Sequence, residues 1–406
     1  MHRDWFIDQH LDRDEVDTMR TYNPDNQRAV RSAEVAMAQV SDNARDDALS
    51  RRALLRRGAA LGLGLPSAAA LLEACGGSSS GGGTPKNSIA GTAVMSNYPA
   101  WMGAHVVADF ERLHPGSKIR QITSASSSIA GTVQQLRSGT YDFALADASA
   151  TGQAVAVGIV APLDWSKIPN IKFVSQNFRS GFPHGIPTDY GKVGIGYRPD
   201  LVGEKISSWH DVWRLAPKFS GKVVFIDIDR DCMGSTLKYL GHSGNSTVPS
   251  QLNACKDALV RIKPHLQAFL NTNVGQGLRD GSTVIAMDWD YDVAFNKQKQ
   301  PKIEWVFPAE GMVAYIEGWI AVKSSPRLPL VETFMNFALQ PRQYADFVNT
   351  TGTAYVEPAA TSFVAKSIAG NPVLRPGHAV ANVEYEHFLG QATPLWTNIW
   401  QEVKAA

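Results

Sequence analysis

Carboxylate and aromatic side chains gather in this sequence at the points where short apolar segments end. The run 227–231 places three aspartates at alternate positions after the apolar segment 223–226. The run 288–292 places three more aspartates around a Trp and a Tyr, directly after 284–287. Carboxylates accept strong hydrogen bonds from ammonium groups, and aromatic faces attract cations. These residue types together predict a site for an organic cation with apolar spacers.

The candidates for ligand contacts fall into two groups. Rings and acids that stand next to one another at segment ends, where they have no evident structural use, are Tyr98, Trp289, Tyr315 and Glu317. Other acids and rings nearby are equally well explained as a helix cap, as core side chains or as structural or solvated groups, namely Asp231, Trp101, Trp319, Asp288 and Asp292.

The elements that must position these residues alternate along the chain. The hydrophobic spacing predicts strands at 89–95, 119–122 and 143–146, separated by helices at 101–113 and 127–138. This order of strands and helices is typical of a parallel sheet covered by helices.

A second α/β set begins near residue 193. It contains predicted strands at 223–226 and 284–287 and helices near 233–241 and 249–263. The chain crosses between the two sets near 190 and again near 310, and two crossings imply a hinge. We therefore expect an α/β fold of two lobes with a ligand cleft between them. The expected units are 88–190 for the first part of lobe 1, 191–309 for lobe 2, and 310–406 for the return to lobe 1 with the C-terminal helices.

From about Ile89 to the C-terminus the chain resembles the bacterial spermidine/putrescine-binding proteins, the extracytoplasmic subunits of polyamine ABC transporters. The resemblance rests on four collinear stretches: 97–101 (Asn-Tyr-Pro-Ala-Trp), 138–142 (Ser-Gly-Thr-Tyr-Asp), 238–247 (Lys-Tyr-Leu-Gly-His-Ser-Gly-Asn-Ser-Thr) and 307–311 (Phe-Pro-Ala-Glu-Gly). It implies a two-lobed type II periplasmic-binding-protein fold that hands a polyamine to a permease.

The resemblance also implies which residues would hold the ligand. The family's ligand-binding positions fall on Tyr98, Trp101, Asp231, Trp289, Tyr315 and Glu317. Weaker candidates are Asp227, Asp229, Ser149, Asp290 and Tyr355. The chain departs from the family after the third strand, where Ala148-Ser149-Ala150 stands in place of tyrosines, and Tyr355 lies only near the family's late tyrosine. This departure bears on which amine is bound more than on its charge.

The segment 50–75 has the three parts of an export signal. The pair Arg51-Arg52 precedes an uncharged run, 58–72, that is too short as a helix to cross a bilayer core of about 30 Å. The paired arginine marks the twin-arginine route, and Leu72-Glu73-Ala74-Cys75 resembles a lipoprotein cleavage box. We expect a signal at 50–74 and a lipid on Cys75, which would anchor the protein to the membrane of the periplasm or cell surface.

The segments on either side of the signal are not expected to join the fold. The Gly- and Ser-rich segment 75–87 reads as a flexible tether. The polar segment 1–49 reads as an extension that is disordered or not translated, with Met1 and Met37 as alternative starts.

The composition bears on the partners, disulfides and metal sites that can be expected. The net charge of +1 gives no reason to expect a nucleic-acid partner. After Cys75 only Cys232 and Cys255 remain, and whether they form a disulfide stays open. The scattered His residues do not suggest a metal site, and we expect no cofactor and a monomer.

Three classes of function stay open. The first is a polyamine-binding transport protein, and the second is a binding protein for another solute such as a quaternary amine or ferric ion. Ferric sites favour clustered tyrosines, and the chain has no adjacent Tyr pair. The third is a secreted hydrolase that uses a carboxylate pair. Because no metalloprotease motif occurs and the only G-x-S-x-G match lies in the tether, we expect no enzyme activity.

Overall fold

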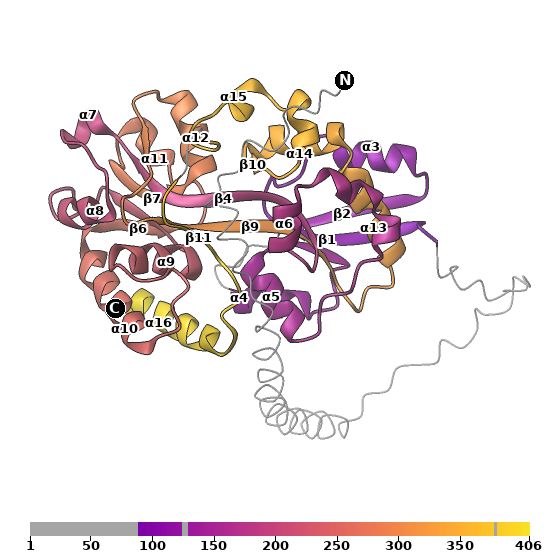
Figure 1. The fold of residues 1–406 in the computed structure, drawn as a ribbon, viewed down its shortest axis with the longest axis horizontal. Helices are drawn as coiled ribbons and strands as arrows, with labels where there is room; N and C mark the ends of the chain where they lie inside the picture. The colour runs from indigo at the N-terminus through magenta and orange to yellow at the C-terminus, as the bar shows by residue number, and fades with distance from the viewer. Residues whose placement is uncertain (1–87, 124–128, 377–379) are drawn as a thin grey trace, which may run out of the picture.

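The computed structural model describes residues 88–123, 129–376 and 380–406. The predicted signal, with Arg51, Arg52 and Cys75, and the alternative starts Met1 and Met37 lie outside the described residues. The described residues form two hydrophobic cores that lie side by side, each in its own lobe (Figure 1). Among them, no helix has the length and apolar character needed to cross a membrane.

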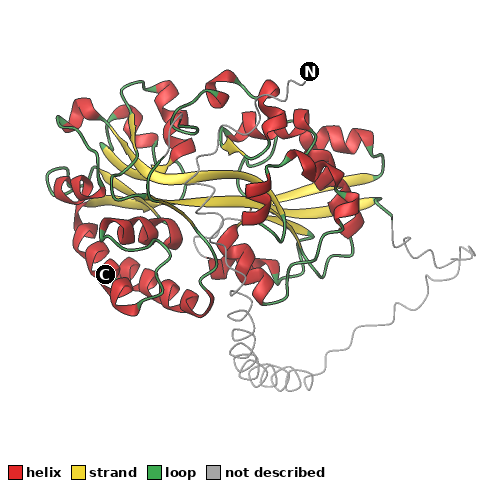
Figure 2. Cartoon of the chain, in the orientation of Figure 1, coloured by secondary structure: helices red, strands yellow, loops and turns green. Residues whose placement is uncertain are grey.

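One sheet runs through both lobes. Its strands follow the order β2-β1-β3-β9-β4-β7-β5-β6, while β8 and β10 pair with β4 and β11 pairs with β9. Figure 2 shows helices on both faces of this sheet. The strands are β1 (Gly91–Asn97), β2 (Ser117–Thr123), β3 (Phe143–Asp147), β4 (Ile186–Tyr197), β5 (Val223–Ile226), β6 (Leu266–Leu270), β7 (Ile285–Trp289), β8 (Glu304–Val306), β9 (Met312–Ala321), β10 (Ala354–Tyr355) and β11 (Val383–Tyr385).

The helices separate the strands much as the hydrophobic spacing predicts. The α-helices are α3 (Val106–Leu113), α4 (Ile129–Leu136), α5 (Ala148–Ala156), α6 (Gln176–Gly181), α7 (Pro199–Val202), α8 (Trp209–Leu215), α9 (Asp229–Tyr239), α10 (Pro249–Ile262), α11 (Gln276–Asp280), α12 (Asp290–Lys299), α13 (Leu328–Ala338), α14 (Pro341–Thr351), α15 (Lys366–Ala369) and α16 (Thr393–Ala405). The predicted parallel pairing of the first three strands is confirmed, because β1 pairs in parallel with both β2 and β3.

Two long antiparallel strands carry the chain between the cores. Strand β4 leaves the first lobe and β9 returns to it, at the two places where crossings are predicted. Every residue of both strands is buried, as expected for central strands covered on both faces. The chain also crosses a third time, which the sequence analysis missed: Tyr385 belongs to the first core, whereas Leu389 and Trp396 belong to the second. The C-terminal helix α16 therefore packs on α10 in lobe 2.

The two cysteines do not pair. Cys232 in α9 and Cys255 in α10 are both free and buried, and the Cys255 thiol points to the backbone oxygen of Met233 at 3.5 Å. The possible disulfide is therefore not formed, and the second core is held together by packing.

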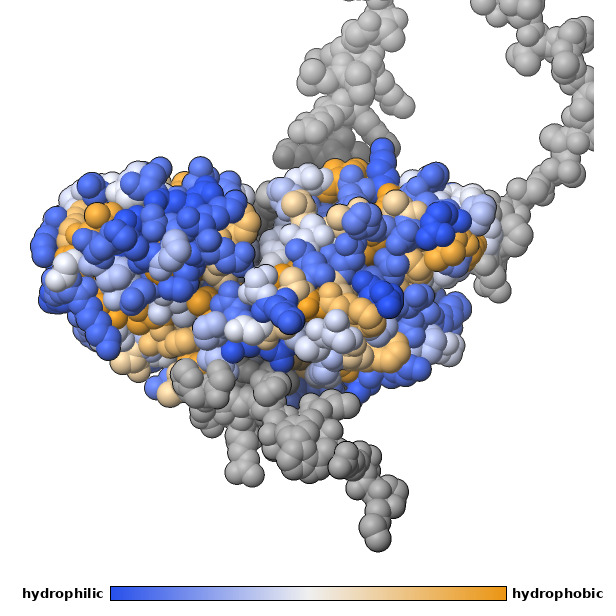
Figure 3. Space-filling model, turned by 90° about the horizontal axis from the view of Figure 1, so that it is seen from above, coloured by the Kyte–Doolittle hydropathy of each residue, from blue (hydrophilic) through white to orange (hydrophobic). Residues whose placement is uncertain are grey.

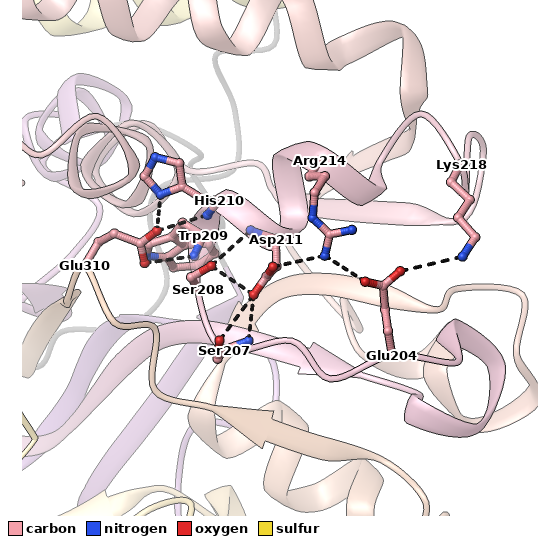
Figure 4. Close-up of polar contacts among 9 residues, drawn as sticks. All are labelled: Glu204, Ser207, Ser208, Trp209, His210, Asp211, Arg214, Lys218 and Glu310. Atoms are coloured by element: carbon pink, nitrogen blue, oxygen red, sulfur yellow. Dashed lines mark hydrogen bonds and ion pairs between the residues drawn. The ribbon is translucent and has the colours of Figure 1, made fainter.

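The surface of lobe 2 is mainly hydrophilic on the face shown at the left of Figure 3. The α8 region of this lobe illustrates how the return crossing is fastened (Figure 4). Glu310 stands just before β9 and accepts the backbone N–H groups of Trp209 and His210 at 2.9 and 3.0 Å. Glu310 thereby provides hydrogen-bond acceptors for two backbone N–H groups at the N-terminus of α8. Burial opposes ionisation of Glu310, but hydrogen bonds from His210 and these backbone groups lower its pKa.

Replacing Glu310 with Ala is expected to lower the free energy of unfolding by about 1–3 kcal/mol, because two backbone donors lose their acceptor. Urea denaturation at pH 7 measures this loss. Glu204→Ala is the matched control, since Glu204 forms exposed ion pairs with Arg214 and Lys218, which contribute only about 0–1 kcal/mol. Equal losses in the two variants would refute this role of Glu310.

Candidate ligand-binding site

Three carboxylates line up across neighbouring strands where the chain leaves the first lobe. Glu317 in β9 is the direct partner of Asp147 in β3 on one side and of Asp189 in β4 on the other. Directly paired residues project to the same face of a sheet, so the three side chains form one row. Like charges in such pairs are destabilising, and this row is therefore costly without a cation or protons.

Burial increases the cost of placing these negative charges side by side. It raises the pKa of Asp189 to about 7. Burial also raises the pKa of Glu317 well above its usual value, and the charges of Asp189 and Asp147 raise it further. A hydrogen bond of 2.8 Å from the Thr188 hydroxyl to Oδ1 of Asp189 partly offsets the shift of Asp189. The row therefore holds protons near neutral pH unless a cation replaces them.

Lobe 2 contributes an acid that holds an aromatic ring. The Nε1–H of Trp289, at the end of β7, donates a hydrogen bond of 2.9 Å to Oδ2 of Asp231 in the first turn of α9. Burial raises the pKa of Asp231 to about 7, and the charge of Asp147 from lobe 1 adds to the shift. Asp231 does not cap α9: the N-cap residue is Ile228, and it makes no side-chain capping bond.

Four rings from both lobes stand beside these acids. Tyr98 and Trp101 meet edge to face with centroids 6.2 Å apart, and Trp101 meets Tyr291 in the same way at 5.1 Å. Tyr291 in turn stacks on Trp289 at 5.9 Å. Ala100 lies in the left-handed region at φ 59°, and this conformation belongs to the turn that presents the first two rings. Such faces attract cations and shield them from water.

The Tyr315 side chain fits against β4 only because residue 191 is a glycine. Gly191 of β4 pairs with Tyr315 of β9, and a Cβ atom at Gly191 would lie 2.2 Å from the Tyr315 hydroxyl. The same Cβ would lie 2.9 Å from Oδ1 of Asp290, so the hydroxyl and this carboxylate share one small space. Gly191 therefore sets the position of Tyr315 beside a buried acid.

The weaker candidates separate into two groups. Asp229 and Ser149 are buried at the starts of α9 and α5, and burial raises the pKa of Asp229 to about 6. Tyr355 pairs in register with Asp189, although its hydroxyl donates to Thr361 at 3.1 Å. Asp227 is not brought to the cluster: Nζ of Lys404 donates to both of its carboxylate oxygens, at 2.8 and 2.9 Å.

The three acids at 227–231 do not share the one face that an extended chain would give them, and the helix predicted near 233–241 begins earlier. Helix α9 begins at Asp229, so the run does not stay extended. Acids in the first turn of a helix are favoured by its dipole, which explains the early start. Trp319 is a core residue, packed against Phe334 and Phe347.

Asp288 and Asp292 are structural as well. Asp288 accepts the backbone N–H of Trp289 at 2.7 Å, and Asp292 accepts that of Gly275 at 2.7 Å. They stabilise the turn that carries Trp289.

Sequence reasoning missed three residues of this cluster, Asp147, Asp189 and Glu386, and did not name Tyr291 of the run 288–292 as a ligand contact. Asp147 follows a predicted strand directly and could have been found by the rule applied to the other strands. Asp189 lies inside a continuously buried strand, and Glu386 follows a strand of three residues, so neither carries such a signal.

Comparisons with known proteins agree with this architecture. Residues 105–374 match the model of the family described as bacterial extracellular solute-binding protein. A spermidine/putrescine-binding periplasmic protein of Escherichia coli is 24% identical over 276 residues, which cover 66% of this chain and 79% of that protein. A putrescine/cadaverine-binding protein of Pseudomonas aeruginosa is 23% identical over 298 residues, covering 70% and 84%.

Solved structures share the fold. The substrate-binding protein of a spermidine/putrescine ABC transporter from Streptococcus pneumoniae superposes with a TM-score of 0.64 at 20% identity, covering 77% of this chain and 98% of that one. A lipoprotein of Treponema pallidum gives 0.66 at 19% identity, covering 77% and 99%. The predicted two-lobed α/β fold is thus confirmed, and the chain belongs to the bacterial extracellular solute-binding protein family.

Proposed function

We propose that this protein binds a polyamine of the putrescine and spermidine class at the acidic and aromatic cluster and delivers it to an ABC permease. The row Asp147–Glu317–Asp189 carries the proposal, because three carboxylates in register, two of them buried and Asp147 half-buried, attract cations. The names of the relatives that match 65–70% of the chain support the same ligand class.

The cluster offers enough interaction energy for such a ligand. Each desolvated carboxylate–ammonium hydrogen bond contributes about 1.5–3 kcal/mol, and each cation–aromatic contact about 0.5–2 kcal/mol. Two or three of the former with ring contacts reach the roughly 8 kcal/mol of a micromolar complex. The methylene groups of a diamine would pack against the ring cluster of Trp101, Tyr291 and Trp289.

Titration calorimetry of the purified protein tests this function. Putrescine, spermidine and agmatine are the amine probes, and a neutral sugar is the control. We expect at least one amine to bind with a dissociation constant at or below the micromolar range and the sugar to give no binding heat. Absence of heat with every amine would exclude the polyamine function.

The proposal includes a location for the protein. Relatives are periplasmic binding proteins by name. Export by the twin-arginine route, with a lipid on Cys75 and a monomer tethered by 75–87, would keep a binding protein beside its permease. Cys75→Ser should then move the protein from the membrane fraction to the soluble fraction, and an unchanged membrane fraction would count against the lipid.

A further inference from the structure

Arg230 is a buried cation at one end of the acidic cluster. It is only 2% exposed, in the first turn of α9 between Asp229 and Asp231. Its Nε lies 4.0 Å from Oε2 of Glu386, which follows the third crossing strand β11. The acids around this guanidinium come from both lobes, since Asp147 is also within the reach of its charge.

The guanidinium is held in place from its other side. It stacks over the Trp396 ring of α16 with Cζ 4.4 Å from the ring centroid. Its Nη2 donates to the side-chain oxygen of Asn245, whose own amide donates to the backbone oxygen of Tyr385 at 3.0 Å. The indole of Trp396 is fixed in turn by a hydrogen bond of 2.9 Å to Ser246. Arg230 is therefore seated by α16 and by the loop that follows α9.

Part of the hydrogen-bonding capacity of the Arg230 guanidinium is unused. Within the part of the chain that the structure describes, Nε and Nη1 of Arg230 are buried without a hydrogen-bond partner, as is Oε1 of Glu386. Burial raises the pKa of Glu386, the charge of Asp231 raises it further, and the charge of Arg230 offsets part of the shift. Arg230 thus acts here as an ammonium group of a ligand would.

The two ends of the cluster differ in this respect. The charges that raise the pKa of Glu317 are all carboxylates, those of Asp189, Asp147 and Asp231. Near Glu386 and Asp231, the protein supplies one positive charge of its own. At the Glu317 end, the positive charge has to come from ammonium groups of a ligand. At the end with Glu386 and Asp231, Arg230 supplies part of it.

We propose that Arg230 occupies the place of one ligand ammonium group and so limits the site to amines with two cationic centres. This inference rests on the proposed polyamine function and assigns the ligand class as a diamine. A third ammonium would have to approach the guanidinium at Glu386 and Asp231, where the like charge cancels its gain.

The test compares putrescine with spermidine by calorimetry on wild type and on Arg230→Gln. Wild type should bind spermidine no more than about threefold more tightly than putrescine. In Arg230→Gln the freed acids can accept the third ammonium, so the preference for spermidine should rise at least tenfold. The double variant Arg230→Gln/Glu386→Gln removes one of the freed acids and should lose most of that gain.

Arg342→Gln is the matched control, because Arg342 also stacks on a ring, at 4.4 Å from Phe363, on the exposed surface. It should leave both affinities unchanged. A folded Arg230→Gln with an unchanged ratio overturns the inference, as does wild type that binds spermidine tenfold more tightly than putrescine, a measurement that does not depend on any variant folding. In both cases wild type still binds amines, whereas failure of the proposed function would show as no amine binding at all.

Discussion

Replacing Glu317 with Gln is expected to weaken diamine binding about 10- to 150-fold, the loss of one charge-assisted hydrogen bond of roughly 1.5–3 kcal/mol. Gln keeps the shape of the side chain but not its charge. The two neighbouring acids, Asp147 and Asp189, remain in the row, so binding is weakened and not abolished. Calorimetry with putrescine at pH 8 measures the change.

The same variant is expected to leave the ligand-free protein as stable as wild type, or more stable. The pKa of Glu317 is higher in the folded than in the unfolded protein. Its carboxyl therefore destabilises the fold increasingly as the pH rises above the pKa that it has in the unfolded chain. Gln removes this effect, which includes the repulsion by the two paired acids, about 0.2–1 kcal/mol for each pair. The gain in unfolding free energy should be present at pH 8 and disappear near pH 4.

Glu402→Gln serves as the control for both measurements. Glu402 makes an ion pair of 2.8 Å with Lys256, and its side chain is 58% exposed, so neither affinity nor stability should change. If Glu317→Gln instead lost several kcal/mol of apo stability with its affinity intact, Glu317 would be a structural residue and not a ligand contact.

Some features of the fold and of the candidate site could be predicted from the sequence, and others could not. The crossings near 190 and 310 and the acids and rings at Asp231, Trp289, Tyr315 and Glu317 follow from local patterns and from a family resemblance. The row of carboxylates does not, because it depends on the register of β3, β9 and β4, which come from distant parts of the chain. Pairing register is a property of the assembled sheet, and no local pattern encodes it.

The errors have local causes of the same kind. Asp227 has the right residue type at the right strand end, but the early start of α9 leaves it to pair with Lys404. Glu386 and the third crossing were missed because β11 has only three residues and shows no periodic pattern. Arg230, read from sequence as one residue in an acidic run, gains its role only from Trp396 and Asn245, which lie far along the chain.

The affinity for diamines is expected to rise with pH, by about 100-fold between pH 5 and pH 7 if binding releases one proton. Asp189 and Asp231 have pKa values raised to about 7, and that of Glu317 is raised as well, mainly by burial. Below pH 7 these acids carry protons that an ammonium group must displace. Amines with ordinary pKa values near 10 stay charged throughout, so the dependence belongs to the protein. Above the raised pKa values no proton remains to be displaced, and the affinity should level off.

Calorimetry separates this proton release from other effects of pH. At pH 6.5, titrations in two buffers with different ionisation enthalpies should give different heats, and the difference counts the protons released. Glu317→Gln should lower that count because it removes one carboxyl of the row, whereas Glu402→Gln should not change it. A dissociation constant that stays flat from pH 5 to pH 8 would mean that these acids are ionised before the ligand arrives. The cost of holding three in-register carboxylates would then have to be met by the fold itself, and ligand binding would not depend on displacing protons from them.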